Sequence, residues 1–287
     1  MIIRNVHAIT YSSGEYEGAK VALGMSAIKK GFNSFYCFSR MDLDSQFLEK
    51  NSATLLKTRG AGYWIWKPYI LQLSSHRLKS NDVIMYLDAG VLPRFDSYFY
   101  YNLIEDDRIH VWIWEKSVMQ EWTDPIIFDA LKLTSSAKLN PMIMAGVILS
   151  KNTIKLQRFT EYWLALCENP ELLRPETFDG YIKKSPLIWH RHDQSILTAI
   201  VYENPEWFVV HSDASDGMSN EHVFDIHRNG KLKHIFLIPV FPKLRLFRRQ
   251  IMQLLPAWIR RYIRNMRTIR GGKVISNLEI QSLNEKY

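Results

Sequence analysis

Asp88 is the first residue whose position in the sequence suggests chemistry. It directly follows the apolar run 83–87 and precedes Ala89 and Gly90, which are too small to block access to its carboxylate. A carboxylate at the end of a strand can bind a divalent metal, and small neighbours let a sugar or ribose approach the backbone. The alternative is an aspartate that caps the following turn, which is a common role for this residue type.

A second group of polar residues opens the predicted helix over 193–202. Asp193 and Gln194 follow His192 at the start of this helix, where their side chains can reach a ligand. The alternative for Asp193 is a plain helix cap, because Asp is among the residues preferred at that position.

A third group lies further along the chain, where His227 is followed by Gly230 and then by Lys233 at intervals of three residues. An imidazole can join a carboxylate on a manganese-type ion, a glycine admits a phosphate close to the backbone, and a lysine neutralises its charge. The alternative is a loop histidine followed by the start of a basic tail.

The segment 59–69 is rich in aromatic and cationic residues, with two Trp, two Tyr, one Arg and one Lys. Such a segment can form a platform that stacks on a base or a sugar. The alternative is that Trp64 and Trp66 fill the core beneath the helix that follows. We expect at least one of Arg59 and Lys67 to face an anionic ligand, because two cations so near apolar aromatics need an anionic partner.

The elements that must position these residues alternate between strands and helices. The pattern predicts strands over 2–10, 34–38, 82–87, 109–114 and 142–149, and helices over 15–30, 154–167 and 193–202. This order favours an α/β fold with a mostly parallel sheet and helices on both faces. Ligands of such sheets gather at the carboxyl ends of strands, which is where Asp88 is expected.

Composition excludes several classes of protein. With 287 residues, 47% hydrophobic and 23% charged, the chain is neither disordered, collagenous nor a coiled coil. Two distant cysteines exclude a zinc ribbon and a disulfide scaffold and favour a reducing compartment. The amino terminus becomes polar too soon for a signal-peptide core, and no stretch approaches 18 uncharged apolar residues, so we expect no membrane span.

The formal net charge of +8 is concentrated near the carboxyl end. Residues 231–273 contain 12 Lys and Arg and no Asp or Glu, so the preceding part is slightly acidic. Apolar residues recur at helical spacing after Pro242 and Pro256, with arginines grouped opposite them. The pattern favours amphipathic helices on an anionic membrane surface over a helical pair packed on the body. Nucleic acid is not expected, because no zinc finger, RNP-like or basic-zipper pattern accompanies the charge.

Taken together, a strand-end carboxylate, then Asp-Gln-x-x-Leu, then His-x-x-Gly-x-x-Lys resemble the motif order of retaining glycosyltransferases with the GT-A fold. The similar group is the lipopolysaccharide galactosyltransferase and glycogenin type, whose nucleotide-binding start also resembles Thr10, Tyr16 and Ser26. The segments 59–69, 86–90 and 190–195 are similar to bacterial proteins from capsule and O-antigen clusters. The resemblance covers residues 1–235, which we expect to form a GT-A-like catalytic domain, with 236–287 as a basic helical tail.

The resemblance implies roles for individual residues. Asp88 and His227 would hold a divalent cation, Mn²⁺ or Mg²⁺, and Asp193 and Gln194 would lie beside the reacting sugar carbon. The implied substrate-binding residues are Thr10, Tyr16, Arg59, Gly62, Tyr63, Trp66, Lys67, Ala89, Gly90, Gly146, His192, Gly230 and Lys233. The family has a second acidic residue where this chain has Gly90, so the alternative is that Lys67 and Arg59 neutralise the leaving group without metal.

The implied activity is transfer of a hexose from a nucleotide diphosphate sugar, UDP-linked, to a lipid-linked or surface polysaccharide acceptor. The basic tail would attach the enzyme to the inner face of the cell membrane, where the acceptor is anchored. The motif order favours retention of the anomeric configuration, whereas Asp193 as a general base would give inversion. The alternatives are a catalytically inactive membrane or polyanion-binding protein and a nucleotidyltransferase.

Overall fold

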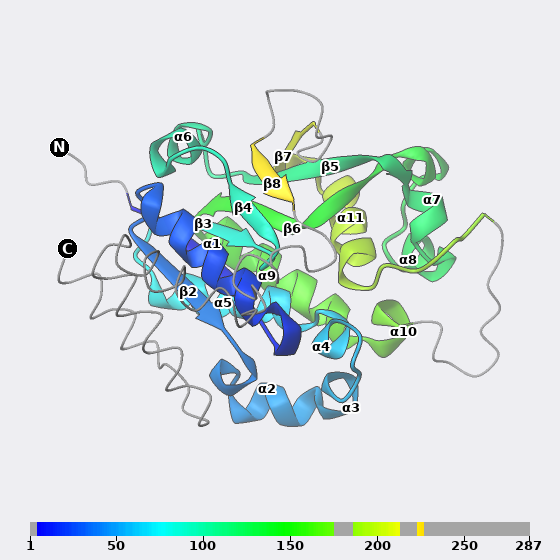
Figure 1. The fold of residues 1–287 in the computed structure, drawn as a ribbon. Coiled ribbons are helices and arrows are strands. Elements are labelled where there is room, and N and C mark those ends of the chain that lie inside the picture. Colours follow the sequence, from blue (N-terminus) through cyan, green and yellow to red (C-terminus); the bar gives the residue numbers. More distant parts are fainter. Residues whose placement is uncertain (1–4, 175–185, 213–222, 227–287) are drawn as a thin grey trace, which may run out of the picture. The chain divides into compact units, whose positions relative to one another are not determined.

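A six-stranded sheet organises the part of the chain that the computed structural model describes, which comprises residues 5–174, 186–212 and 223–226. Its strand order is β2-β1-β3-β6-β5-β7, and a two-stranded sheet pairs β4 with β8 (Figure 1). The strands are β1 (Val6–Tyr11), β2 (Ser34–Phe38), β3 (Val83–Leu87), β4 (Val91–Pro93), β5 (Ile109–Val118), β6 (Pro141–Lys151), β7 (Phe208–His211) and β8 (Phe224–Ile226).

The helices lie mostly between these strands in the chain. The α-helices of the described residues are α1 (Glu17–Lys29), α2 (Ser45–Lys50), α3 (Ser52–Leu55), α4 (Gly60–Tyr63), α5 (Trp66–Arg77), α6 (Ser97–Asn102), α7 (Met119–Trp122), α8 (Pro125–Ala130), α9 (Ile154–Glu168), α10 (Pro170–Leu173) and α11 (Asp193–Glu203). No helix among the described residues combines the length and the apolar character that crossing a bilayer requires.

The large sheet is mostly parallel, as the sequence predicts. β1 is parallel to both β2 and β3, and β5 is parallel to β7. Only β6 runs the other way within this sheet, because it is antiparallel to both of its neighbours, β3 and β5. The predicted α/β class is therefore confirmed, with one reversed strand inserted in the middle of the sheet.

Helices cover both faces of this sheet, and the alternation of side chains along each strand explains why. In β3, Ile84 and Tyr86 pack in the cluster that contains the apolar sides of α5, α9 and α11. Val83, Met85 and Leu87 pack in the cluster on the opposite face, together with residues of α1 and α6. All five residues of β3 are buried. An uninterrupted apolar strand is expected when both faces of a sheet are covered.

An irregularity in β6 breaks this alternation close to the end of β3. Ile143 and Ala145 face one cluster, and Ile148 faces the same cluster, so the alternation shifts by one residue around Gly146. The pairing with β5 shifts at the same place, which marks a β-bulge. Bulges redirect the backbone and re-aim side chains, and this bulge lies directly beside Asp88, whose amide donates to the Gly146 carbonyl.

Most predicted elements lie within a few residues of the observed ones. The predicted strand 34–38 coincides with β2, and the helix predicted over 154–167 ends one residue later, at Glu168. The strand predicted over 109–114 is longer, since β5 continues to Val118, and the helix predicted over 15–30 begins as a 3₁₀ turn at Gly14–Tyr16. The chain divides into units Met1–Leu232 and Lys233–Tyr287. The predicted helices of the basic tail lie outside the described residues.

Candidate active site

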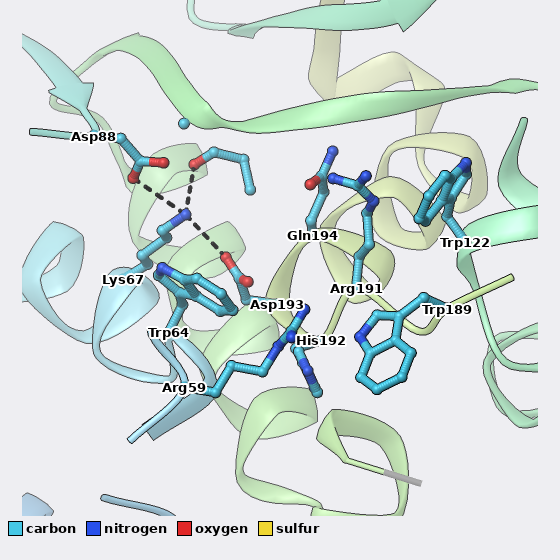
Figure 2. Close-up of a pocket in the computed structure, with 12 residues that line it drawn as sticks. Arg59, Trp64, Lys67, Asp88, Trp122, Trp189, Arg191, His192, Asp193 and Gln194 are labelled. Atoms are coloured by element: carbon cyan, nitrogen blue, oxygen red, sulfur yellow. Dashed lines mark hydrogen bonds and ion pairs between the residues drawn. The ribbon is translucent and has the colours of Figure 1, made fainter. Parts of the chain in front are cut away.

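A pocket of about 470 Å³ opens beside the carboxyl end of β3. This volume is within the usual range for small-molecule sites. Segments far apart in the chain line it, namely 59–67, the end of β3, the bulge of β6, the end of α7 and the start of α11. Its residues are Arg59, Trp64, Lys67, Asp88, Trp122, Ala145, Gly146, Trp189, Arg191, His192, Asp193 and Gln194 (Figure 2).

Lys67 is the central residue of this pocket. Its Nζ lies 3.2 Å from Asp88 Oδ1 and 3.1 Å from Asp193 Oδ2, and it donates a hydrogen bond of 3.2 Å to the Ala145 carbonyl. Figure 2 shows these three interactions converging on the ammonium group. Lys67 is only 3% exposed. An ammonium group has three N–H donors, so three oxygens around it satisfy a charge that burial would otherwise make costly.

The charges of this cluster shift the pKa values of its members. Burial acts to lower the pKa of Lys67, but the negative charges of Asp193 and Asp88 outweigh it and hold that pKa above its ordinary value. Burial raises the pKa of Asp193 to about 7, against the attraction of Lys67 and with the added repulsion of Asp88. Asp193 therefore changes its charge near neutral pH, whereas Lys67 stays cationic there.

The end of β3 and the bulge of β6 fix Asp88 in this cluster. The hydroxyl of Tyr86 donates to Asp88 Oδ1. A Cβ atom at Gly146 would lie 2.9 Å from Asp88 Oδ2, so any larger residue at position 146 would push the carboxylate away. The Asp88 side chain remains 39% exposed, in contrast to the buried Lys67. Asp88 is thus the partly open member of the cluster, available to a ligand in the pocket.

The start of α11 is held from several sides. His192 has φ of 48° and ψ of −119°, and its Nδ1 lies 2.8 Å from the Leu173 carbonyl. The Trp163 indole donates to the Asp193 carbonyl, at 3.3 Å. Gln194 Nε2 donates to the Ile143 carbonyl of β6, at 2.7 Å. His192 is the N-cap residue and makes no side-chain capping bond, while the Asp193 carboxylate pairs with Lys67. The alternative that Asp193 is a plain helix cap is therefore wrong, because His192 occupies the N-cap position and the Asp193 carboxylate pairs with Lys67.

The sequence left open whether the two tryptophans of segment 59–69 fill the core or face a ligand, and one tryptophan does each. Trp66 is buried, stacks on Tyr11 with 4.0 Å between ring centroids, and donates from Nε1 to the Gly60 carbonyl. Trp64 is half-buried, lines the pocket and has a φ of 61° in the left-handed region. The chain reverses direction here through several residues of positive φ, and this turn sends neighbouring indoles to different places.

Two arginines and several tryptophans form the rest of the pocket lining. The Arg191 guanidinium carbon lies 4.1 Å from the ring centroids of both Trp114 and Trp122. The Arg59 guanidinium carbon lies 5.1 Å from the ring centroid of Trp189 and 5.9 Å from that of Trp64. These are cation–π distances. Trp122, Trp189 and Arg191 are functional candidates that no sequence motif predicts, and the nearest signal is the position of Trp189 and Arg191 just before His192.

The structure brings seven of the predicted site residues together in the pocket, namely Arg59, Lys67, Asp88, Gly146, His192, Asp193 and Gln194. Other predicted residues do not line it. Thr10, Tyr63, Trp66 and Ala89 are buried, Gly62 approaches Leu55, Gly90 is half-buried, and Tyr16 is 48% exposed. Tyr63 supports the pocket from behind, because its ring lies 4.3 Å from that of His192. The remaining predicted residues, His227, Gly230 and Lys233, lie outside the described residues.

The described residues do not by themselves make a metal site. Within the described ranges, no group of three or more His, Cys, Asp or Glu side chains is arranged to hold an ion. The two carboxylates of the pocket already pair with an ammonium group, and Gly90 offers no third carboxylate. A divalent cation bound by oxygen ligands needs more donors than this set provides.

The chemistry of the pocket follows from its three kinds of side chain. Carboxylates accept hydrogen bonds from hydroxyl groups and stabilise positive charge, guanidinium groups bind phosphate or carboxylate, and indole faces stack on apolar ring surfaces. A ligand that combines hydroxyl groups, an apolar ring face and negative charge matches all three.

Comparisons with known proteins give matches among solved structures. No family model matches the chain, and no curated protein matches it. The chain is similar to a glycosyltransferase involved in the glycosylation of the major capsid of PBCV-1, with 12% identity, a TM-score of 0.42, and coverage of 74% of this chain and 84% of that one.

Two further solved structures are similar at the same level. The bifunctional glycosyltransferase WbbM matches with 12% identity and a TM-score of 0.44, over 73% of this chain and 39% of that one, so the chain spans well under half of its length. The galactosyltransferase LgtC, in complex with donor and acceptor sugar analogs, matches with 12% identity and a TM-score of 0.40, over 71% of this chain and 72% of that one. The substrate of this chain has to be inferred from its own site.

Loss of the Lys67 side chain should destabilise the fold, because Lys67 is the cation of the buried ion cluster. Lys67→Met would leave the carboxylates of Asp88 and Asp193 facing each other without a cation. We expect the free energy of unfolding to fall by about 3–5 kcal/mol, which is typical when one partner of a buried ion pair is removed. Urea unfolding monitored by tryptophan fluorescence measures the change.

Two further variants control this measurement. Lys155→Met removes a lysine that pairs with Asp107 at the surface, and should cost less than about 1 kcal/mol. The double variant Lys67→Met with Asp193→Asn removes one of the facing charges and should recover part of the loss. A Lys67→Met protein as stable as the Lys155→Met protein would contradict the role assigned to the cluster.

Proposed function

We propose that this chain is a glycosyltransferase that moves a hexose from a nucleotide diphosphate sugar, UDP-linked, to a lipid-linked or surface polysaccharide acceptor. The observation that carries the proposal is the Lys67–Asp88–Asp193 cluster beside a wall of arginines and tryptophans in one pocket. Glycosyl transfer needs side chains that bind the sugar hydroxyls, that offset the negative charge of the leaving group and that stabilise positive charge at the reacting carbon. The pocket offers a candidate for each.

Recognition of the sugar fits the indoles and the oxygens of the pocket. Trp64, Trp122 and Trp189 line the pocket, and stacking of a sugar face on an indole buries apolar C–H groups. Asp88 is open enough to accept hydrogen bonds from hydroxyl groups. Because Gln194 is bonded to β6 through its Nε2, its orientation is set before a sugar binds.

The chemical step breaks the bond between the anomeric carbon and the diphosphate oxygen. Positive charge develops on the sugar, and an ionised Asp193 would stabilise it in a site largely shielded from water. The departing diphosphate carries negative charge, which arginines of the pocket can offset. In a reaction with retention, which the motif order favours, the acceptor oxygen bonds to the anomeric carbon on the face that the diphosphate leaves, and the departing diphosphate takes the acceptor proton, so Asp193 contributes electrostatic support alone. In an inverting reaction, Asp193 would instead accept the proton of the acceptor hydroxyl. Both reactions require the carboxylate form.

The proposed function is tested by incubating the protein with UDP-linked hexoses and a lipid-linked glycan acceptor and measuring release of UDP. Activity should fall below pH 7, because protonation of Asp193, whose pKa is about 7, removes the charge that the reaction needs. The logarithm of the rate should approach a slope of one per pH unit well below that pKa. Asp193→Asn should lower the rate by about 10²–10⁴-fold.

The control for this experiment is Asp107→Asn, which removes a surface carboxylate paired with Lys155 and should leave both the rate and the pH profile unchanged. Release of pyrophosphate in place of UDP would identify a nucleotidyltransferase. If none of the UDP sugars is turned over and UDP does not raise the Tm, the alternative of a catalytically inactive binding protein is favoured.

A divalent cation, Mn²⁺ or Mg²⁺, remains a proposal that depends on Asp88 together with His227. If the cation belongs to the site, UDP should raise the Tm more in the presence of Mn²⁺ than in the presence of EDTA, since binding to the native state stabilises it. Asp88→Asn and His227→Ala should each abolish that difference. Equal shifts of Tm with Mn²⁺ and with EDTA would overturn the proposal and favour neutralisation by side chains.

Attachment to the inner face of the cell membrane is proposed for the basic tail, residues 236–287, from its sequence alone. Each basic side chain near an anionic surface adds on the order of 1 kcal/mol. Replacing Arg260, Arg261, Arg264 and Arg267 by Glu should therefore prevent sedimentation of the full chain with phosphatidylserine vesicles. Sedimentation with neutral vesicles serves as the background. Undiminished binding of the variant to the anionic vesicles would refute membrane attachment by the tail.

A further inference from the structure

Segment 60–64 forms a turn of unusual hand. All five of its residues have positive φ, between 50° and 102°. Ala61, with φ of 50° and ψ of 48°, is close to the geometry of a left-handed helix. The Tyr63 amide donates to the Arg59 carbonyl four residues earlier, at 2.8 Å, which is the spacing of α-helical hydrogen bonds. The segment is therefore one turn of left-handed helix.

This turn is strained, because only two of its five residues are glycines, which adopt positive φ freely. Gly60 is required on a second ground, since a Cβ atom there would lie 2.3 Å from the Trp64 ring. Ala61, Tyr63 and Trp64 are disfavoured in this conformation, because their Cβ atoms crowd the following carbonyl oxygen. Such a turn persists only when the contacts around it hold it in place.

His192 is a second strained residue of the pocket. It has a positive φ of 48° and a ψ of −119°. Its side chain is buried, and its Nδ1 lies 2.8 Å from the Leu173 carbonyl. Six non-glycine residues in the described part of the chain have positive φ, and four of them are His192 and three members of segment 60–64. Strained residues cluster at functional sites, so this concentration favours a functional role for both segments.

The two strained segments contact each other and carry the two members of the buried ion pair. The centroids of the Tyr63 and His192 rings lie 4.3 Å apart, with 31° between the ring planes. The Lys67 amide donates to the Trp64 carbonyl, at 2.9 Å, so Lys67 follows directly from the turn. Asp193 is the residue after His192. The ring contact and the ion pair, with 3.1 Å between Lys67 Nζ and Asp193 Oδ2, therefore join the same two segments.

We propose that Tyr63 and His192 are positioning residues. Their ring contact, the Tyr63–His192 brace, fixes the left-handed turn against the start of α11 and so holds Lys67 against Asp193. Tyr63 acts from outside the pocket, because it is 8% exposed and does not line it. This role differs from the substrate contact that the family resemblance implies for Tyr63. The inference rests on the proposed glycosyl transfer, in which Asp193 supports positive charge on the sugar.

The first measurement compares the Tm of two matched variants, Ala61→Gly and Ala22→Gly. Both alanines are half-buried, but Ala22 lies in the right-handed helix α1. Ala61→Gly should raise the Tm, because glycine relieves the strain at positive φ. Ala22→Gly should lower the Tm, because glycine loses more conformational entropy on folding than alanine. A Tm of Ala61→Gly at or below that of wild type would contradict a strained turn and remove the need for a brace.

The second measurement determines whether Tyr63 is coupled to Asp193 without any substrate. Urea unfolding gives the stability of Tyr63→Gly, Asp193→Asn and the double variant, and glycine at position 63 removes the ring while it accepts the φ of 54°. The double variant should lose less than the sum of the two single losses, because without the brace the contact of Asp193 with Lys67 is already weakened.

Tyr162→Ala is the control for this coupling. Tyr162 lies on α9, and its hydroxyl donates to Glu203 at the last residue of α11, at 2.8 Å. Its loss should therefore add to the loss caused by Asp193→Asn.

The third measurement is turnover of UDP-linked hexoses, with kcat and KM determined well below the Tm of every variant. Tyr63→Gly should lower kcat by about tenfold to a hundredfold, because a small displacement of reacting groups is costly. KM should change little, since no residue of the pocket lining is removed. Tyr63→Phe keeps the ring and should keep most of the kcat. Tyr162→Ala should leave kcat unchanged, which separates positioning from a general loss of stability.

The brace is overturned if the stability losses of Tyr63→Gly and Asp193→Asn are additive, or if Tyr63→Gly has the kcat of wild type. Tyr63→Asn takes the place of Tyr63→Gly if the latter does not fold, because asparagine also tolerates positive φ. Absence of turnover by wild type counts against the proposed transfer. The coupling measured in urea decides the brace in that case, because it needs no substrate.

Discussion

The structure of the pocket depends on one buried ammonium group that holds two carboxylates. Lys67 comes from α5, Asp88 from the end of β3, Asp193 from the start of α11, and the Ala145 carbonyl from the bulge of β6. Removing these charges from water is costly, and the cost is offset only when every partner is in place. The cluster therefore favours a single arrangement of four elements that are far apart in the chain.

The burial that makes the ion cluster costly to form also shifts the pKa values of its residues. In water, Asp193 would be ionised throughout the neutral range, whereas its pKa in this site is about 7. Lys67 keeps its charge because two carboxylates face it. A buried acid poised near neutrality beside a partly open carboxylate is an arrangement typical of catalytic sites, although purely structural ion clusters also shift pKa values.

The arginines in the rest of the pocket also lie in apolar surroundings. Arg191 lies against the rings of Trp114 and Trp122, and Arg59 lies against those of Trp189 and Trp64. The cations of the pocket therefore lie among indole rings, and the Trp64 ring is close to both Arg59 and Lys67.

The α/β class, most elements to within a few residues, and the choice of Asp88, Asp193 and Lys67 as candidate site residues follow from the sequence alone. Those features depend on local patterns, because alternation and strand ends are visible over a few residues. The folded structure was needed to show that β6 runs antiparallel, that its bulge brings Gly146 against Asp88, and that Trp66 enters the core while Trp64 lines the pocket. It also decided that Arg191 lies on Trp122 and that Lys67 joins two carboxylates, because these contacts link residues distant in the chain whose approach no local pattern specifies.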